Sequence, residues 1–232
     1  DHRSSQPTTD ELRKVAAAAR VGGMLAGKGG VVSVHVGAGE RILQPLYQAV
    51  SGTELRVKQF YPTHMNRNRR VFEAGIEFTK KGGVIDFTTS TTAYDLRHGE
   101  VAAAAALAEA LYLGVSPMQL TLSSDGNASL PLYNEDGELQ GLQVGQVQSL
   151  YQSFREAVVQ HQVTLANALT SVTAAPAAIL GLKQKGQISA GLDADVLLIR
   201  REDMQLDTVI AKGRMLVQRG AALCRGTFEP EN

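Results

Sequence analysis

The stretch Leu120-Thr121-Leu122-Ser123-Ser124-Asp125-Gly126-Asn127-Ala128-Ser129 decides how this chain is interpreted. An apolar, β-prone run leads to a carboxylate, and glycine and small polar residues follow it. This order is typical of a strand that delivers an acid to the loop at its carboxyl end. In parallel α/β barrels the catalytic groups lie at that end of the strands. Two upstream runs end at or beside His35 and His64, which raises the question of whether the three side chains meet.

Strand-like and helix-like segments alternate through most of the chain. The predicted strands cover residues 31–36, 57–61, 84–87 and 119–123. The predicted helices cover residues 8–20, 40–50, 69–81, 99–113 and 147–158. Each interval between strands has the length of one βα unit, which indicates a parallel sheet, either a barrel or an open doubly wound sheet. Four such strands are about half of an eight-stranded barrel.

The composition changes after residue 162. Two short helices are expected within 164–180, and three short strands follow at 194–199, 208–211 and 214–217. We therefore divide the chain into an α/β part, residues 1–180, and a small β part, residues 181–232.

The composition excludes several classes of protein. The chain has 232 residues, of which 44% are hydrophobic, so a buried core is expected. Lysine plus arginine and aspartate plus glutamate number 23 each, so neither a nucleic-acid nor an anionic-membrane partner is indicated. Cys224 is the only cysteine, which fits a reducing compartment and excludes an intramolecular disulfide. No run approaches the ~20 apolar residues of a membrane span.

Each of the three candidate residues has an ordinary structural explanation when taken singly. His35 suits a partly buried histidine that bonds a carbonyl, His64 a solvated loop residue, and Asp125 a common Asp-Gly turn. Parallel strands, however, place their carboxyl ends on one side of a sheet. Together the three residues therefore predict one metal site.

Imidazole and carboxylate ligands suit zinc, with manganese, iron or nickel as alternatives. A bound metal lowers the pKa of its water to about 7, and a nearby carboxylate can accept the remaining proton. Asp125 is the candidate for that base. Arg3, Arg67 and Ser129 are candidates for holding a substrate carboxylate, with surface solubility or a turn hydrogen bond as the alternative explanation.

Four segments carry a resemblance to a known family. They are Asp1-His2-Arg3-Ser4, Val34-His35-Val36-Gly37, Pro62-Thr63-His64-Met65-Asn66-Arg67-Asn68 and Leu122-Ser123-Ser124-Asp125-Gly126-Asn127. They resemble the isoaspartyl (β-aspartyl) dipeptidases of the amidohydrolase superfamily, and the resemblance covers nearly the whole chain. The tail, Gly186-Gln187-Ile188 through Gly191-Leu192-Asp193-Ala194-Asp195-Val196, is similar to the superfamily's return to its β-sandwich.

The resemblance implies a fold and a chemistry. The fold is the C-terminal half of a TIM-like (β/α)8 barrel over 1–180, followed by strands of a small β-sandwich over 181–232. Two zinc ions are implied, with His35 and His64 as ligands of one, and Asp125 as a ligand of the other and the general base and acid. A metal-bridged hydroxide would attack the amide of a β-aspartyl dipeptide, whose polar ends Arg3, Arg67 and Ser129 would hold. The enzyme would be a cytoplasmic homo-oligomer.

The chain also departs from the family pattern. The family's His-x-His pair, its bridging carboxylated lysine and its upstream glutamate and tyrosine are not in this sequence. We therefore expect a preceding segment that supplies them, without which this chain would neither fold stably nor turn over substrate. Residues 89–98 differ from the family as well, and we expect them to shape the rim of the site.

Three alternatives stay open at this stage. The protein could be another amidohydrolase, such as a D-aminoacylase or a dihydroorotase-like cyclic amidase, or a non-catalytic oligomeric scaffold. A non-catalytic scaffold would be expected to have lost its metal ligands, whereas His35, His64 and Asp125 are all present. The preferred second residue of the dipeptide, the subunit count and the native metal are not predicted.

Overall fold

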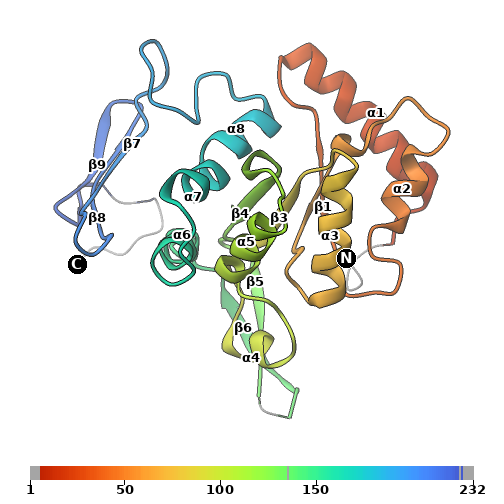
Figure 1. The fold of residues 1–232 in the computed structure, drawn as a ribbon, viewed down its shortest axis with the longest axis horizontal. Coiled ribbons are helices and arrows are strands. Elements are labelled where there is room, and N and C mark those ends of the chain that lie inside the picture. The colour runs from red at the N-terminus through yellow and green to blue at the C-terminus, as the bar shows by residue number, and fades with distance from the viewer. Residues whose placement is uncertain (1–5, 135, 225, 227–232) are drawn as a thin grey trace. The chain divides into compact units, whose positions relative to one another are not determined.

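The structure is a computed structural model that describes residues 6–134, 136–224 and 226. The chain forms two compact units, one that ends at Gly181 and one that begins at Leu182 (Figure 1). The predicted Arg3 lies outside the described residues. In the part of the chain that is described, no helix is both long and apolar enough to span a membrane.

Four short parallel strands form the centre of the first unit. They are β1 (Val32–His35), β2 (Phe60–Thr63), β3 (Ile85–Thr88) and β4 (Leu120–Ser123). β1 pairs with β2 and β3 pairs with β4, both in parallel. The prediction of four strands and of their parallel direction is therefore confirmed, but the bounds of the second strand differ. Among the described residues the strands form small separate sheets and no closed barrel.

Pro62 explains where the prediction for the second strand was wrong. We expected this strand to begin at Val57 and to end before Pro62, whereas residues 57–59 form a 3-10 turn and the strand continues through Thr63. The Val36 N–H donates to the Thr63 carbonyl, so the adjacent position, Pro62, faces β3 instead of β1. Proline has no N–H to donate, and no backbone ladder joins β2 to β3 in the described residues.

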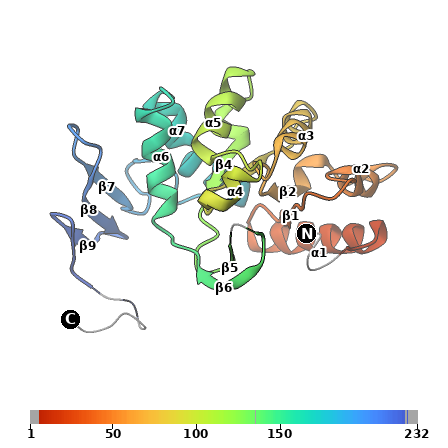
Figure 2. The same cartoon turned by 90° about the horizontal axis from the view of Figure 1, so that it is seen from below.

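Helices connect the strands of the first unit and follow them. They are α1 (Thr9–Ala26), α2 (Gln44–Val50), α3 (Arg69–Lys80), α4 (Ala93–Arg97), α5 (Ala103–Tyr112), α6 (Ser149–Val159), α7 (Leu165–Val172) and α8 (Ala174–Leu180). The capping box that the sequence predicts at Thr8 and Glu11 begins α1. Figure 2 shows α3 and α5 on the same side of the parallel strands.

An antiparallel hairpin follows β4 and was not predicted. It consists of β5 (Ser129–Tyr133) and β6 (Leu139–Val144), which pair along most of their length. The hairpin carries Ser129 at its beginning and lies next to α4 in Figure 1. The Tyr94 and Tyr133 rings, 5.1 Å apart, join α4 to β5.

The second unit is a four-stranded antiparallel sheet in the order β10-β9-β8-β7. Its strands are β7 (Val196–Ile199), β8 (Leu206–Ala211), β9 (Arg214–Gln218) and β10 (Ala221–Ala222). Lys185 forms ion pairs with Asp193 and Asp195, and Asp195 also accepts the Lys212 N–H. These contacts fix the loop that leads into β7.

Candidate metal and substrate site

The four parallel strands present one apolar face and one polar face. Phe60, Ile85, Phe87 and Leu120 are fully buried on the apolar face. The residues between them alternate to the other face. That polar face carries His35, Tyr61, Thr63, Asp86, Thr88, Thr121 and Ser123. The candidate site lies at its carboxyl-terminal edge.

Two imidazoles meet at this edge. His35 is the last residue of β1, and His64 follows β2 directly. The His64 Nε2 and His35 Nδ1 atoms are 3.1 Å apart, and the rings cross at 69°. His64 is only 5% exposed and has a φ of 63°, a left-handed conformation that few residues other than glycine adopt. The sequence-based expectation of a solvated loop histidine therefore does not hold.

The spacing of these nitrogens suits a single metal ion. Two imidazole nitrogens that bind one tetrahedral zinc at about 2.0–2.1 Å lie roughly 3.3 Å apart. The observed 3.1 Å is that of a hydrogen bond between the two rings, and it is also close to the spacing of two ligands of one ion. Across the described residues, however, no group of three or more histidine, cysteine or acidic side chains is placed to hold a metal. The structure therefore brings together two candidate ligands.

Asp125 lies in the loop after β4 with a φ of 49°. The turn is held by the Ala128 N–H, which donates to the Asp125 carbonyl, and by the Gly126 N–H, which donates to Ser124 Oγ. Asp125, His64 and Arg67 line one cavity of about 200 Å³. The structure thus brings Asp125 into the same cavity as His64 without forming a three-ligand cluster with the histidine pair.

The predicted substrate-binding residues lie in different places. The Arg67 Nε–H donates to the Val36 carbonyl at 3.1 Å, which anchors the arginine at the cavity wall. Ser129 is exposed at the first position of β5. The structure therefore brings Arg67, but not Ser129, to the cavity wall among the described residues.

Residues of the segment 89–98, which we expected to shape the rim of the site, form part of the cavity wall. Thr91, Thr92 and Asp95 line the cavity from the segment that contains α4, and Leu130 and Tyr133 line it from β5. A capping box between Thr92 and Asp95 begins α4 and fixes the carboxylate. The segment around α4 and the hairpin therefore form the wall opposite the strand ends.

Two polar residues of the site were missed at the sequence level. Asn66 is fully buried, and its side-chain amide bonds the backbone N–H and C=O of Thr88 and the Val101 carbonyl. Asp86 is buried on β3 and accepts hydrogen bonds from hydroxyl groups. The signal for Asp86 was visible as a lone carboxylate inside an apolar strand, because unpaired acids are seldom fully buried.

Burial controls the protonation of this region. Desolvation raises the pKa of Asp86 to about 6, although hydrogen bonds from Ser123, Thr121, Thr63 and Tyr61 lower it. Desolvation and the nearby Asp86 charge raise the pKa of the Tyr61 phenol, so that it stays a hydrogen-bond donor.

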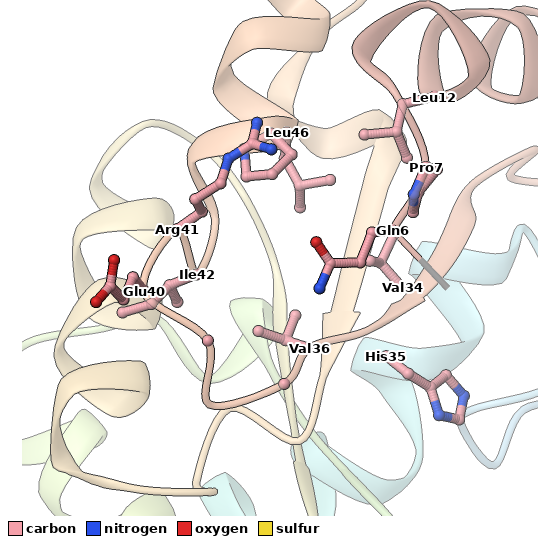
Figure 3. Close-up of a pocket in the computed structure, with 13 residues that line it drawn as sticks. Gln6, Pro7, Leu12, Val34, His35, Val36, Glu40, Arg41, Ile42 and Leu46 are labelled. Carbon is pink, nitrogen blue, oxygen red and sulfur yellow. The ribbon is translucent and has the colours of Figure 1, made fainter. Parts of the chain in front are cut away.

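A larger cavity of about 350 Å³ lies beside β1 and is not the candidate site. Its wall includes the apolar residues Leu12, Val34, Val36 and Leu46. Its polar wall residues include His35, Glu40 and Arg41. In Figure 3 the His35 ring points away from Gln6 and Val36, toward the opposite side of the strand. Because this cavity is mainly apolar and the imidazole turns away from it, we place the chemistry in the smaller cavity.

Comparisons with known proteins identify the family and the fold. The amidohydrolase family model matches residues 97–216. The β-aspartyl dipeptidase from Fervidobacterium islandicum AW-1, solved with a β-Asp-Leu dipeptide, is 38% identical with a TM-score of 0.84. That match covers 99% of this chain and 59% of the dipeptidase.

A second structure of that dipeptidase matches at 36% identity and a TM-score of 0.81, over 99% of this chain and 56% of its own. This chain therefore spans less than two thirds of the dipeptidase. A variant N-acetyl-D-glucosamine-6-phosphate deacetylase from Mycobacterium smegmatis shares the fold, at 19% identity and a TM-score of 0.54, over 92% of this chain and 63% of its own.

Proposed function

This chain belongs to the amidohydrolase family, and from that premise we propose that the protein hydrolyses β-aspartyl dipeptides. The observation that carries the proposal is the His35–His64 pair, with nitrogens 3.1 Å apart, beside a cavity that Arg67 and Asp125 line. Similarity to a β-aspartyl dipeptidase over 99% of this chain supports the class of substrate.

In this proposal His35 and His64 would hold one zinc ion, and Asp125 would hold a second and handle protons. Bound zinc would supply a water that is acidic enough to react near neutral pH. Asp125 accepts the proton from the attacking water and returns it to the leaving amine, a task that suits a carboxylate at the cavity wall. Metal-ligating histidines need fixed rings, and the burial of His64 provides that.

The substrate's charged ends require partners as well. We propose that Arg67 binds a substrate carboxylate. Its Nε–H donates to the Val36 carbonyl and the residue lines the cavity, which supports this role. We propose that Ser129 and Arg3 also contact substrate, Arg3 from outside the described residues.

We propose further that the parallel strands are half of a (β/α)8 barrel and that the second unit contributes strands to a β-sandwich. Residues 1–180 and 181–232 would be the two domains. The protein would be a cytoplasmic homo-oligomer that takes a small dipeptide, and neither nucleic acid nor membrane would be a partner.

The test is hydrolysis by the intact protein of β-aspartyl-leucine, N-acyl amino acids and a cyclic ureide, with zinc analysis of each preparation. We expect turnover of β-aspartyl-leucine only. Cleavage of an N-acyl amino acid or the ureide instead would assign a different amidohydrolase activity. Protein that binds no zinc and cleaves none of the three would be a scaffold.

A pair of histidine variants localises the site. His64→Ala removes a ring of the buried pair, so we expect loss of both bound zinc and turnover. His161→Ala is the matched control, because His161 is exposed and lies beyond α6. Equal zinc content in the two variants would contradict the assignment of His64 as a ligand.

A further inference from the structure

A buried carboxylate that the proposed chemistry does not use lies at the centre of the polar face. Asp86 is the second residue of β3 and is 2% exposed. Asp86 does not line the 200 Å³ cavity. Burying an acid in this way is costly unless hydrogen bonds compensate the lost water. Its contacts therefore need an explanation.

Hydroxyl groups surround both oxygens of this carboxylate. Thr63 Oγ1 donates to Asp86 Oδ2 at 2.6 Å, and Ser123 Oγ donates to the same oxygen. Thr121 Oγ1 donates to Oδ1 at 2.6 Å, and the Tyr61 hydroxyl lies 3.5 Å from Oδ1. An ionised carboxylate accepts about four hydrogen bonds and donates none. The Tyr61 hydroxyl lies closer to Thr121 Oγ1, so three hydroxyls are the close donors to the carboxylate. They match the ionised form, and no lysine or arginine is among the groups that shift the pKa of Asp86 in the part of the chain that is described.

The same residue holds both neighbours of His64. Thr63, which precedes the histidine, donates through its side chain, and the N–H of Met65, which follows it, donates to the Asp86 carbonyl at 3.0 Å. Between these two anchors His64 keeps its φ of 63°. A non-glycine residue persists in this region of φ and ψ only where its surroundings hold it there.

Asp86 also spans a gap in the backbone pairing. β1–β2 and β3–β4 are separate ladders, so the edge of β2 that faces β3 lacks regular backbone bonds among the described residues. Through Oδ2, Asp86 connects Thr63 at the end of β2 with Ser123 at the end of β4. Ser123 stands two residues before Asp125. One carboxylate oxygen thus joins the strand ends that carry the candidate metal ligand and the candidate base.

We propose that Asp86 is a positioning residue that fixes His64 relative to Asp125 through the hydroxyls of Thr63 and Ser123. The inference rests on the proposed function for its kinetic effect, but the placement of His64 can be measured without substrate. Outer partners of metal ligands typically contribute about 10- to 100-fold to metal affinity or activity.

The experiment compares Asp86→Asn and Thr63→Val with Thr79→Val in the intact protein. Thr63→Val removes one hydroxyl from Asp86 and keeps the shape of the side chain. Thr79→Val is the matched control, because the buried Thr79 hydroxyl bonds the Ile76 carbonyl within α3. The readouts are kcat and KM with β-aspartyl-leucine, cobalt(II) affinity by chelator competition, and the visible spectrum of bound cobalt(II).

We expect both site variants to lower kcat about 10- to 100-fold with a small change in KM, to weaken cobalt binding and to shift the cobalt spectrum. The double variant should lose little more than either single variant, because both changes break one linkage. Site variants that match Thr79→Val in kcat, affinity and spectrum would overturn the proposal. Thr63→Val decides the matter if Asp86→Asn does not fold.

The failure of the proposed function gives a different result. Wild-type protein that binds cobalt but leaves β-aspartyl-leucine intact refutes the substrate assignment, while the affinity and spectrum still test Asp86. Wild-type protein that binds no cobalt refutes both.

Discussion

Replacing Asp86 with asparagine changes how the stability of the protein depends on pH. Burial raises the pKa of Asp86 from 3.8 to about 6. The folded protein therefore holds this proton more tightly than the unfolded chain does. This tighter proton binding stabilises the folded protein fully below about pH 3.8, and the stabilisation is lost as the pH rises through about 6. A salt-bridged aspartate has the opposite pH dependence.

The size of the effect follows from the shift. A difference of about two pKa units corresponds to about 3 kcal/mol over the full titration, at about 1.4 kcal/mol for each unit. Between about pH 4.5 and pH 7.5, roughly 2 kcal/mol of the free energy of unfolding should be lost in the wild type because Asp86 ionises. Asparagine has no such titration. The free energy of unfolding of the wild type, minus that of Asp86→Asn, should therefore fall by roughly 2 kcal/mol across this range.

Urea unfolding of both proteins at a series of pH values measures the difference, and titrations that the two proteins share cancel. Thr79→Val serves as a control because it alters a buried hydrogen bond without changing a charge, so its difference from wild type should not vary with pH. A wild-type minus Asp86→Asn difference that stays constant within about 0.5 kcal/mol would refute the reasoning. Asp86→Asn that gains stability near pH 7 while kcat falls would show that the charge is kept for activity.

Four further predictions concern buried or helical positions and the metal. Asn66→Ala should lower the free energy of unfolding by about 2–4 kcal/mol, measured with urea, because it leaves buried backbone groups without partners. Gly23→Ala should destabilise by about 1–3 kcal/mol, since a Cβ there would lie 2.4 Å from the Gly30 Cα atom. Gly22→Ala, with open space around it, should instead stabilise α1 by about 0.5–1 kcal/mol. Removal of metal with a chelator should abolish hydrolysis, and added zinc should restore it; activity that survives a metal-free preparation would contradict the zinc assignment.

The parallel strands and the meeting of the two histidines could be predicted because both depend on local patterns. Apolar, β-branched runs between glycine and proline give the strands, and the parallel direction places His35 and His64 at one edge. The β5–β6 hairpin was missed although Asp136-Gly137 in its loop is a common turn pair. Most of its side chains are exposed, so the hydrophobic pattern that identifies buried strands is weak there.

The role of Asp86 could not be predicted, because it depends on register between strands far apart in the sequence. The pairing of Asp86 with Thr121 across β3 and β4 brings one hydroxyl to the carboxylate. β2 lies beside β3 without a backbone ladder between them, and this brings Tyr61 and Thr63 to the Asp86 carboxylate. A one-residue slip would have turned these side chains to the apolar face.

The polar face itself indicates why such a residue exists. Parallel strands commonly bury apolar side chains on both faces. Here only one face of the four strands does so, with Phe60, Ile85, Phe87 and Leu120. Here hydroxyls and a buried acid occupy positions where apolar residues would stabilise the fold more. The polar residues therefore make the fold less stable at the strand ends next to His64. The left-handed backbone of His64 has to be fixed there. This loss of stability lies beside the proposed metal site, so we attribute the polar face to function rather than to folding.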